Sequence, residues 1–431
     1  MTAAGRARAA ALITGVVLLA GDGVLLMATT PWEPLPGGGS EPDPARDFSP
    51  AELARSAAFD AALNPPAYAG LLTGLAVVLV LGLTPLGARF IGWCTARVPG
   101  RALRLAVAVV AVTTLLRLAA LPLRIWRESV LRRYGLSVQT WPAWLADQLK
   151  SLALAWAIWT VAVLLLYVLA RRFPRYWWAG AAAGGFALVV VLSFLYPLLV
   201  EPVFNRFHSL PAGPLRTELL AMAARDRVPV TDVLVADASR RTTSLNAYVS
   251  GFGSTRRIVV YDTLLKSPPE RIKSIVAHEL GHAKHNDVLR GTLTGALGVS
   301  GGVCLLYLAL TSPGLRRRAG LADRTAEPVV CDPRSVALLL AVVSVLTQLS
   351  GPVQNLISRR VEARADAHAL ALTGDAATFV SMQRELALRN LSDLRPNPVE
   401  YALWFSHPSV PERIAMARDW ARLHGGRAAR P

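Results

Sequence analysis

Residues 278–282 are His-Glu-Leu-Gly-His, an H-E-x-x-H pattern that combines two imidazoles and a carboxylate. On a helix, side chains four positions apart lie on one face, so His278 and His282 can bind one Zn²⁺ ion. Glu279 is rotated off that face and can reach a water molecule on the metal. The expected chemistry is hydrolysis: the metal lowers the pKa of the water towards about 7 and polarises a carbonyl, and the glutamate moves the proton to the leaving amine.

A catalytic zinc site of this type needs a third protein ligand and an open fourth position. Glu362 and Asp366 are four residues apart on a second predicted helix and offer the candidates. Glu362 would ligate the metal, and Asp366 would accept a hydrogen bond from a ligand imidazole and so fix its tautomer. Two acidic residues at this spacing are usually a solvated helix face. Their position after a predicted pair of membrane helices that returns to the motif's side favours the ligand role.

The sequence before the H-E-x-x-H residues contains clear signals for the start of a helix. Ser267 is predicted to cap it, Pro268 to occupy the first helical position, and Glu270 to complete a capping box. Its buried face is predicted to consist of Ile272, Ile275, Val276 and Ala283. Residues 230–237 and 244–262 are rich in β-branched and apolar residues, and the turn at Gly251–Ser254 indicates a hairpin in the second stretch. The helix with Glu362 is predicted to end at Gly374.

The amino-acid composition of the whole chain indicates a membrane protein. The chain has 431 residues, of which 53% are hydrophobic, and a mean hydropathy of +0.39. A membrane-spanning helix needs about 20 mainly apolar residues. Seven segments meet or approach that length: about 10–28, 66–88, 102–123, 150–170, 177–200, 291–312 and 335–356. The first is the weakest and resembles a secretory signal, but no typical cleavage site follows it, which favours a retained span.

The net charge of +17 does not indicate nucleic-acid binding, because the arginines are spread over short loops between apolar segments. Topology and contact with lipid headgroups explain them better. The three cysteines, Cys94, Cys304 and Cys331, are too scattered for a disulfide framework or a thiolate metal site. Abundant arginine and alanine with few lysines suggest a bacterial coding sequence. We therefore expect a multi-pass protein of a bacterial cell membrane.

The chain is predicted to have four regions. Residues 1–200 hold membrane helices 1–5, residues 201–290 a first catalytic segment with the H-E-x-x-H helix, residues 291–356 membrane helices 6–7, and residues 357–431 a second catalytic segment with Glu362. Neither catalytic segment is expected to fold alone. The Pro/Gly-rich segment 31–44 is expected to be flexible.

An ordered set of motifs supports a family resemblance. Besides H-E-x-x-H and E-x-x-A-D, the set comprises Pro202–Arg206, Ser244–Gly251, Arg257–Leu264, Phe405–Pro408 and Glu412–Arg413. With its seven spans, the sequence resembles the type-I CAAX prenyl protease family of M48 integral-membrane zinc metallopeptidases, in a bacterial-like form.

This resemblance implies a mainly α-helical fold: a seven-transmembrane-helix barrel around a chamber, with a zincin-like α+β catalytic domain formed from two soluble segments. It implies one Zn²⁺ per chain and a peptide or protein substrate, with membrane lipids around the barrel. Asn246 and Ala247 would lie on an edge strand that binds the substrate backbone. His407 and Arg413 would approach the substrate or the oxyanion of the tetrahedral intermediate.

Alternatives remain open at this point. The runner-up is an HtpX-like membrane protease of protein quality control, which resembles the same clan but usually has fewer spans. A non-catalytic metal-binding membrane protein is a further alternative, which the retained Glu279 disfavours. After the H-E-x-x-H residues the sequence is closer to bacterial relatives, so a prenylated substrate does not follow. Loop charges place the N-terminus in the cytoplasm and the site opposite, whereas the resemblance implies a cytosolic site. His285 is expected to be a surface or supporting group, and His208, His368 and His424 have no assigned role.

Overall fold

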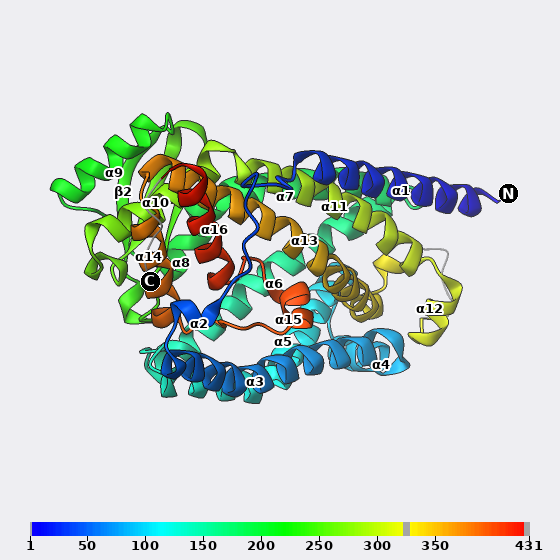
Figure 1. Cartoon of the computed structure of the whole chain (residues 1–431). Helices are drawn as coiled ribbons and strands as arrows, with labels where there is room; N and C mark the ends of the chain where they lie inside the picture. Colours follow the sequence, from blue (N-terminus) through cyan, green and yellow to red (C-terminus); the bar gives the residue numbers. More distant parts are fainter. Residues whose placement is uncertain (1, 322–327, 426–431) are drawn as a thin grey trace.

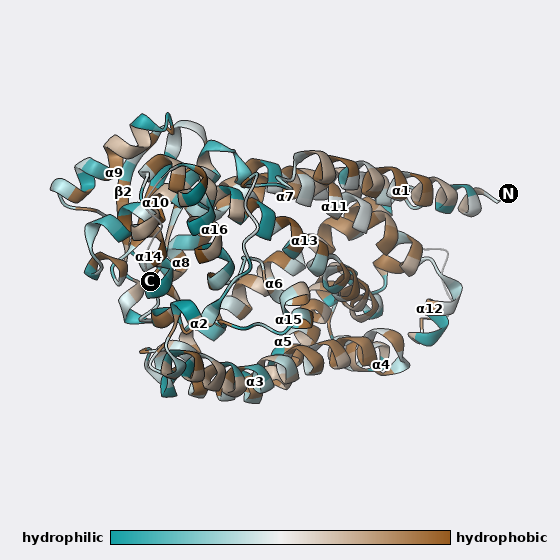
Figure 2. Ribbon diagram, viewed as in Figure 1, coloured by the Kyte–Doolittle hydropathy of each residue, from teal (hydrophilic) through white to brown (hydrophobic). Residues whose placement is uncertain are grey.

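The protein has two parts, a bundle of long helices and a smaller lobe at one end of it (Figure 1). The structure, a computed structural model, describes residues 2–321 and 328–425. Hydrophobic residues dominate the long helices, whereas polar residues are concentrated in the lobe (Figure 2). The N-terminus lies at the end of the bundle farthest from the lobe. This distribution is that of a membrane part with a water-exposed part attached to one end.

Seven helices of the described chain are long and apolar enough to cross a membrane. Six of them are α1 (Ala3–Thr29), α3 (Pro50–Leu83), α5 (Arg101–Arg133), α6 (Trp141–Arg172), α11 (Asp287–Leu310) and α13 (Val336–Thr373). The seventh begins as α7 (Trp177–Leu195) and continues through a π-helical turn at Tyr196–Val200 into α8 (Glu201–Phe204). The prediction of seven membrane helices is confirmed.

Six of these helices close a ring. α3 packs on α5, α5 on α6, α6 on α7, α7 on α11, α11 on α13, and α13 returns to α3. α1 extends the wall by packing along α11, where a Cβ on Gly15 would lie only 3.0 Å from the Cβ of Cys304. The short helices α4 (Pro85–Thr95) and α12 (Pro313–Arg318) lie at the end away from the lobe (Figure 1). The predicted helical barrel is thus present.

The lobe is built on a four-stranded sheet. Its strands are β1 (Phe207–Ser209), β2 (Val230–Ala236), β3 (Ala247–Ser250) and β4 (Arg256–Tyr261), in the order β1-β2-β4-β3. β2 and β4 are parallel, while β3 pairs antiparallel with β4, so the predicted hairpin is confirmed. β3 lies at the edge of the sheet, as the resemblance implied for the strand near Asn246.

Two helices, α9 (Pro214–Arg225) and α10 (Pro269–Lys284), pack directly on this sheet. Behind them α14 (Ala376–Asn390) packs on α10, and α16 (Val410–Leu423) packs on α14. The short helices α2 (Pro44–Asp47) and α15 (Pro398–Trp404) pack on α3 and α13, respectively. One hydrophobic core joins Ile258 of β4, Val276 of α10, Phe379 of α14 and Ile414 of α16. The second half of α13 enters the same lobe and ends at Gly374, which has φ +66°, as predicted. The two soluble segments therefore fold as one unit.

Two local predictions are wrong. Ser267 does not cap α10, because its hydroxyl donates to Glu385 (2.9 Å). Pro268 lies one position before the helix, which starts at Pro269, and Glu270 completes no capping box. Segment 31–44 is not free, because the buried Asp419 carboxylate of α16 accepts from the backbone N–H of Gly39 and of Ser40, both at 2.8 Å. Both deviations come from tertiary partners that lie more than 100 residues away in the chain.

Candidate metal centre and active site

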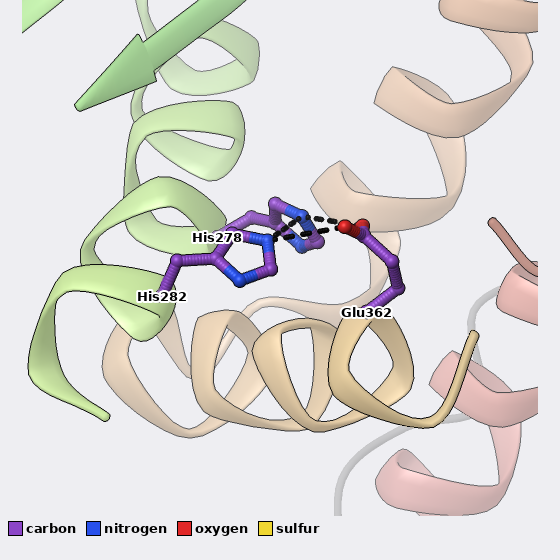
Figure 3. Close-up of side chains that lie close together, drawn as sticks. All are labelled: His278, His282 and Glu362. Carbon is purple, nitrogen blue, oxygen red and sulfur yellow. Dashed lines mark hydrogen bonds and ion pairs between the residues drawn. The ribbon is translucent and has the colours of Figure 1, made fainter. Parts of the chain in front are cut away.

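Helix α10 presents the two histidines of the motif from one face. Its other face is buried in the lobe core, where Ile272, Ile275, Val276 and Ala283 are each at most 7% exposed, as predicted. This packing fixes the rotation of the helix about its axis. His278 is itself buried and His282 is half-buried. The imidazoles therefore point away from the core and into the space between α10 and α13 (Figure 3).

Gly281 sets the close approach of α13 to α10. A Cβ at this position would lie 3.2 Å from the Cα of Ala365 and 3.1 Å from the Cβ of His368. A larger residue would push the helices apart and withdraw Glu362 from the histidines. His368 Nε2 donates to the Asp226 carboxylate at 2.9 Å, so it belongs to this helix crossing and not to the cluster of ligand candidates.

Three donor atoms converge between the helices (Figure 3). The Nε2 atoms of His278 and His282 are 3.1 Å apart, and they lie 3.1 and 3.4 Å from the carboxylate oxygens of Glu362. All three ligand atoms fall within 4.8 Å of one another. Tetrahedral bonds of about 2.0–2.2 Å separate ligand atoms by roughly 3.3–3.6 Å. The spacing and the donor types therefore fit a zinc ion held by two imidazoles and one carboxylate.

Asp366 and Arg413 form a support for the His278 imidazole, on the side of its Nδ1 atom. The imidazole Nδ1 lies 2.7 Å from Asp366 Oδ1, and Asp366 is fully buried. Arg413 of α16 donates to both oxygens of that carboxylate, through Nε at 2.7 Å and through Nη2. A proton on Nδ1 leaves Nε2 free to bind a metal. Burial lowers the pKa of His278, but the Asp366 carboxylate outweighs it, so the pKa lies above its ordinary value.

A second, similar pair of residues supports His282, and no sequence motif predicts it. Nδ1 of His282 lies 3.0 Å from Asp287, whose other oxygen accepts from Arg364 of α13. Burial lowers the pKa of His282, but hydrogen bonds to Asp287 and Glu362 raise it to about 10 overall. Asp287 follows Asn286, whose backbone is left-handed (φ +53°), and no sequence motif predicts this turn of the chain. The only available signal was the acidic residue one turn beyond the motif.

Glu279 follows His278 on α10 and is half-buried beside the cluster. Burial raises its pKa above the ordinary value; the Glu362 carboxylate adds to this, while His278, His282 and Arg413 oppose it. A carboxylate with a raised pKa is a stronger proton acceptor than one in water. A raised pKa beside the converging donor atoms is the property that a general base needs.

The remaining predicted site residues are distributed around the cluster. His407, on the loop between α15 and α16, places Nε2 3.4 Å from Glu362 Oε2. Arg413, predicted to approach the substrate, is partly buried and bound to Asp366, and its side chain is 12% exposed. Asn246 precedes β3, and its carbonyl accepts from Tyr261 N–H at 3.0 Å, while Ala247 begins the edge strand. His285 ends α10 outside the cluster, and its ring lies 5.8 Å from that of His368.

Known proteins resemble this chain over most of its length. Residues 209–421 match peptidase family M48, and residues 66–206 match the CAAX prenyl protease N-terminal family, described as five membrane helices. An uncharacterised metalloprotease of Bacillus subtilis, YhfN, is 30% identical over 380 residues, which cover 88% of each protein. The CAAX prenyl protease 1 homolog of Oryza sativa is 30% identical over 305 residues, or 69% of each.

The fold has a solved counterpart as well. The crystal structure of S. mikatae Ste24p superimposes with a TM-score of 0.75 at 22% identity, covering 94% of this chain and 98% of that one. This similarity extends over both the helical bundle and the lobe, so the arrangement of the two parts is shared. The chain is a multi-pass membrane metalloprotease that belongs to the type-I CAAX prenyl protease family of M48 peptidases.

Proposed function

We propose that this protein is a zinc-dependent endopeptidase of a bacterial cell membrane that cleaves membrane-associated or C-terminal, CAAX-like protein segments. One observation carries the proposal: ligand atoms from α10 and from the lobe end of α13, which are separated in the chain by membrane helix α11, meet within 4.8 Å. His278, His282 and Glu362 would hold the ion. When bound, zinc would lower the pKa of a coordinated water towards about 7 and polarise the scissile carbonyl.

The chain's own residues then move the protons. Glu279 takes a proton from the attacking water as its oxygen bonds to the carbonyl carbon. When the carbon–nitrogen bond breaks, the same carboxyl group gives that proton to the departing amine. Its raised pKa suits both steps, because the group must first accept and then release a proton near neutral pH.

Edge strand β3 and His407 would position the substrate. The edge of β3 opposite β4 is unpaired within the described sheet, so an extended peptide can add to it next to Asn246 and Ala247. His407 lies close to Glu362 from the other side and can donate to the oxygen that becomes negative during attack. Arg413 would act indirectly, by holding Asp366 against His278.

The test compares wild type with Glu279→Gln in detergent, using a quenched fluorescent peptide. We expect wild-type hydrolysis to stop with a chelator and to return with zinc. Glu279→Gln should keep one zinc per chain but lose at least about 100-fold in kcat, since removing a general base typically costs 10²–10⁴-fold. The matched control is Glu270→Gln, the same change at an exposed position two turns earlier on α10, which should cleave like wild type.

Two results would contradict the proposal: equal metal content without cleavage in any variant, which would favour a metal-binding protein, or cleavage by Glu279→Gln at the wild-type rate. The substrate class needs a separate measurement. Peptides captured from membranes by Glu279→Gln and identified by mass spectrometry should be enriched in C-terminal segments of membrane-associated proteins. Enrichment of unfolded membrane proteins without a preferred terminus would instead favour a quality-control protease.

A further inference from the structure

The loop between α15 and α16 leaves the side chain of His407 exposed. The side chain of His407 is 58% exposed, and its nearest polar partners are Glu362 Oε2 at 3.4 Å and the Ser406 hydroxyl at 2.9 Å. An exposed side chain on a loop samples many positions unless the backbone beneath it is held. The position of His407 therefore depends on what fixes the chain on either side of it.

On the N-terminal side, two residues of α13 hold the backbone. Arg359 Nη1 donates to the carbonyls of Tyr401 (2.9 Å) and Phe405 (2.6 Å), and Asn355 Nδ2 donates to the carbonyl of Leu403 (2.6 Å). These carbonyls belong to the last turn of α15 and the residue after it, where a helix leaves most carbonyls without an intrahelical partner; the Tyr401 carbonyl also accepts from the Phe405 N–H at 3.3 Å. Arg359 and Asn355 thus cap α15 from outside.

Arg359 makes a further contact that fixes its direction. Its guanidinium carbon lies 4.4 Å from the centre of the Tyr401 ring, a cation–π geometry. The Tyr401 hydroxyl donates in turn to Glu412 at 2.8 Å, and Glu412 closes the capping box of α16 with Ser409. The loop between α15 and α16 is consequently held at both ends by one connected set of bonds.

The residues that hold the loop lie on the same helix, α13, as the third ligand candidate, Glu362. Asn355, Arg359 and Glu362 lie within two turns of α13, so the rise between Arg359 and Glu362 is about 4.5 Å. A rigid helix that binds both the cluster and the loop sets the distance between them.

We propose that Arg359 and Asn355 are positioning residues for the reaction: by binding the carbonyls of Tyr401, Leu403 and Phe405, they keep His407 at the edge of the metal-ligand cluster. This inference rests on the proposed function, because it requires His407 to contact the substrate during hydrolysis. It concerns residues for which the sequence motifs assign no role. Neither side chain has to touch the substrate.

A double-mutant cycle separates this role from general stabilisation. Arg359→Ala should lower kcat by about 10- to 100-fold with zinc content and KM nearly unchanged, as loss of one preorganised group in a transition state does. His407→Ala should show a similar loss. If Arg359 acts through His407, the double variant should be no more than about 3-fold slower than His407→Ala alone.

Two further variants sharpen the cycle. Asn355→Ala removes one bond and should lower kcat by about 3- to 10-fold, so it replaces Arg359→Ala if that protein does not fold. Arg360→Ala is the matched control, because within the described chain Arg360 is exposed and donates to none of the three carbonyls. It should behave like wild type.

Losses that multiply in the double variant, or wild-type activity of His407→Ala, would overturn the inference. Loss of zinc in Arg359→Ala would do the same, since the residue would then support the cluster itself. These outcomes are distinct from failure of the proposed function, which shows in Glu279→Gln. If that variant is inactive and the cycle is multiplicative, only the role of Arg359 and Asn355 is refuted.

Discussion

Both histidines of the cluster are backed by an aspartate and an arginine, but the two supports differ in depth and in origin. Asp366 behind His278 is completely buried, whereas the side chain of Asp287 behind His282 is 11% exposed. Arg413 grips Asp366 with two nitrogens, and the structure records a single bond from Arg364 to Asp287. The same chemistry is thus built once inside the lobe and once near its surface.

The difference shows how depth changes the function of a support. A buried carboxylate between an imidazole and a guanidinium has no water to replace a lost partner, so each member depends on the others. A carboxylate with partial access to water can lose a partner and be rehydrated. We therefore expect the His278 support to determine whether the site forms, and the His282 support to adjust how tightly the site binds its metal.

Asp366→Ala should have the largest effect. It leaves Arg413, whose side chain is 12% exposed, without its carboxylate and His278 without the acceptor that orients it, and breaking a pair with a fully buried partner costs about 3–5 kcal/mol of unfolding free energy. Zinc affinity should fall by at least about 100-fold. Thermal unfolding in detergent and metal content after dialysis check both expectations. Retention of zinc with an unchanged unfolding temperature would show that depth does not matter here.

Asp287→Ala should be milder on both measures. Losing an outer hydrogen-bond partner typically weakens metal binding by 10- to 100-fold, and we expect about 10-fold at this position, where the carboxylate keeps partial access to water. The unfolding temperature should change little, because water can solvate Arg364 once the carboxylate is gone. If Asp287→Ala matched Asp366→Ala in both zinc affinity and stability, the contrast between the two supports would disappear.

Proton release provides a third comparison. Before a metal binds, the pKa of His282 is about 10, so at pH 8 its imidazole is protonated and must lose about one proton to become a ligand. Zinc affinity should consequently rise as pH increases towards 10. Removing Asp287 takes away a bond that raises this pKa, so Asp287→Ala should release fewer protons and show a flatter pH dependence. Calorimetric titration at pH 8 in buffers of different ionisation enthalpy measures the number; an unchanged number would contradict this assignment.

The same contrast explains what the sequence could predict. Asp366 was found because it lies four residues after Glu362, and helical periodicity puts both on one face. The seven apolar segments and the β3–β4 hairpin could also be predicted from the sequence, because segment length and the local pattern of residue types determine them. Asp287 was missed because it reaches His282 through a left-handed turn at Asn286. Arg359 was missed for another reason: its partners are carbonyls over 40 residues away, and sequence patterns do not reveal backbone partners.

The smallest expected effect distinguishes the two arginines. Lysine keeps the charge of arginine but offers no planar fork, so it can replace a single contact better than a paired one. Arg364→Lys should therefore change zinc affinity by less than about 3-fold, while Arg413→Lys should weaken it by about 10-fold. Competition with a coloured chelator can resolve both values. Equal losses in the two variants would mean that charge alone, and not the two-nitrogen grip on Asp366, is what the deeper support requires.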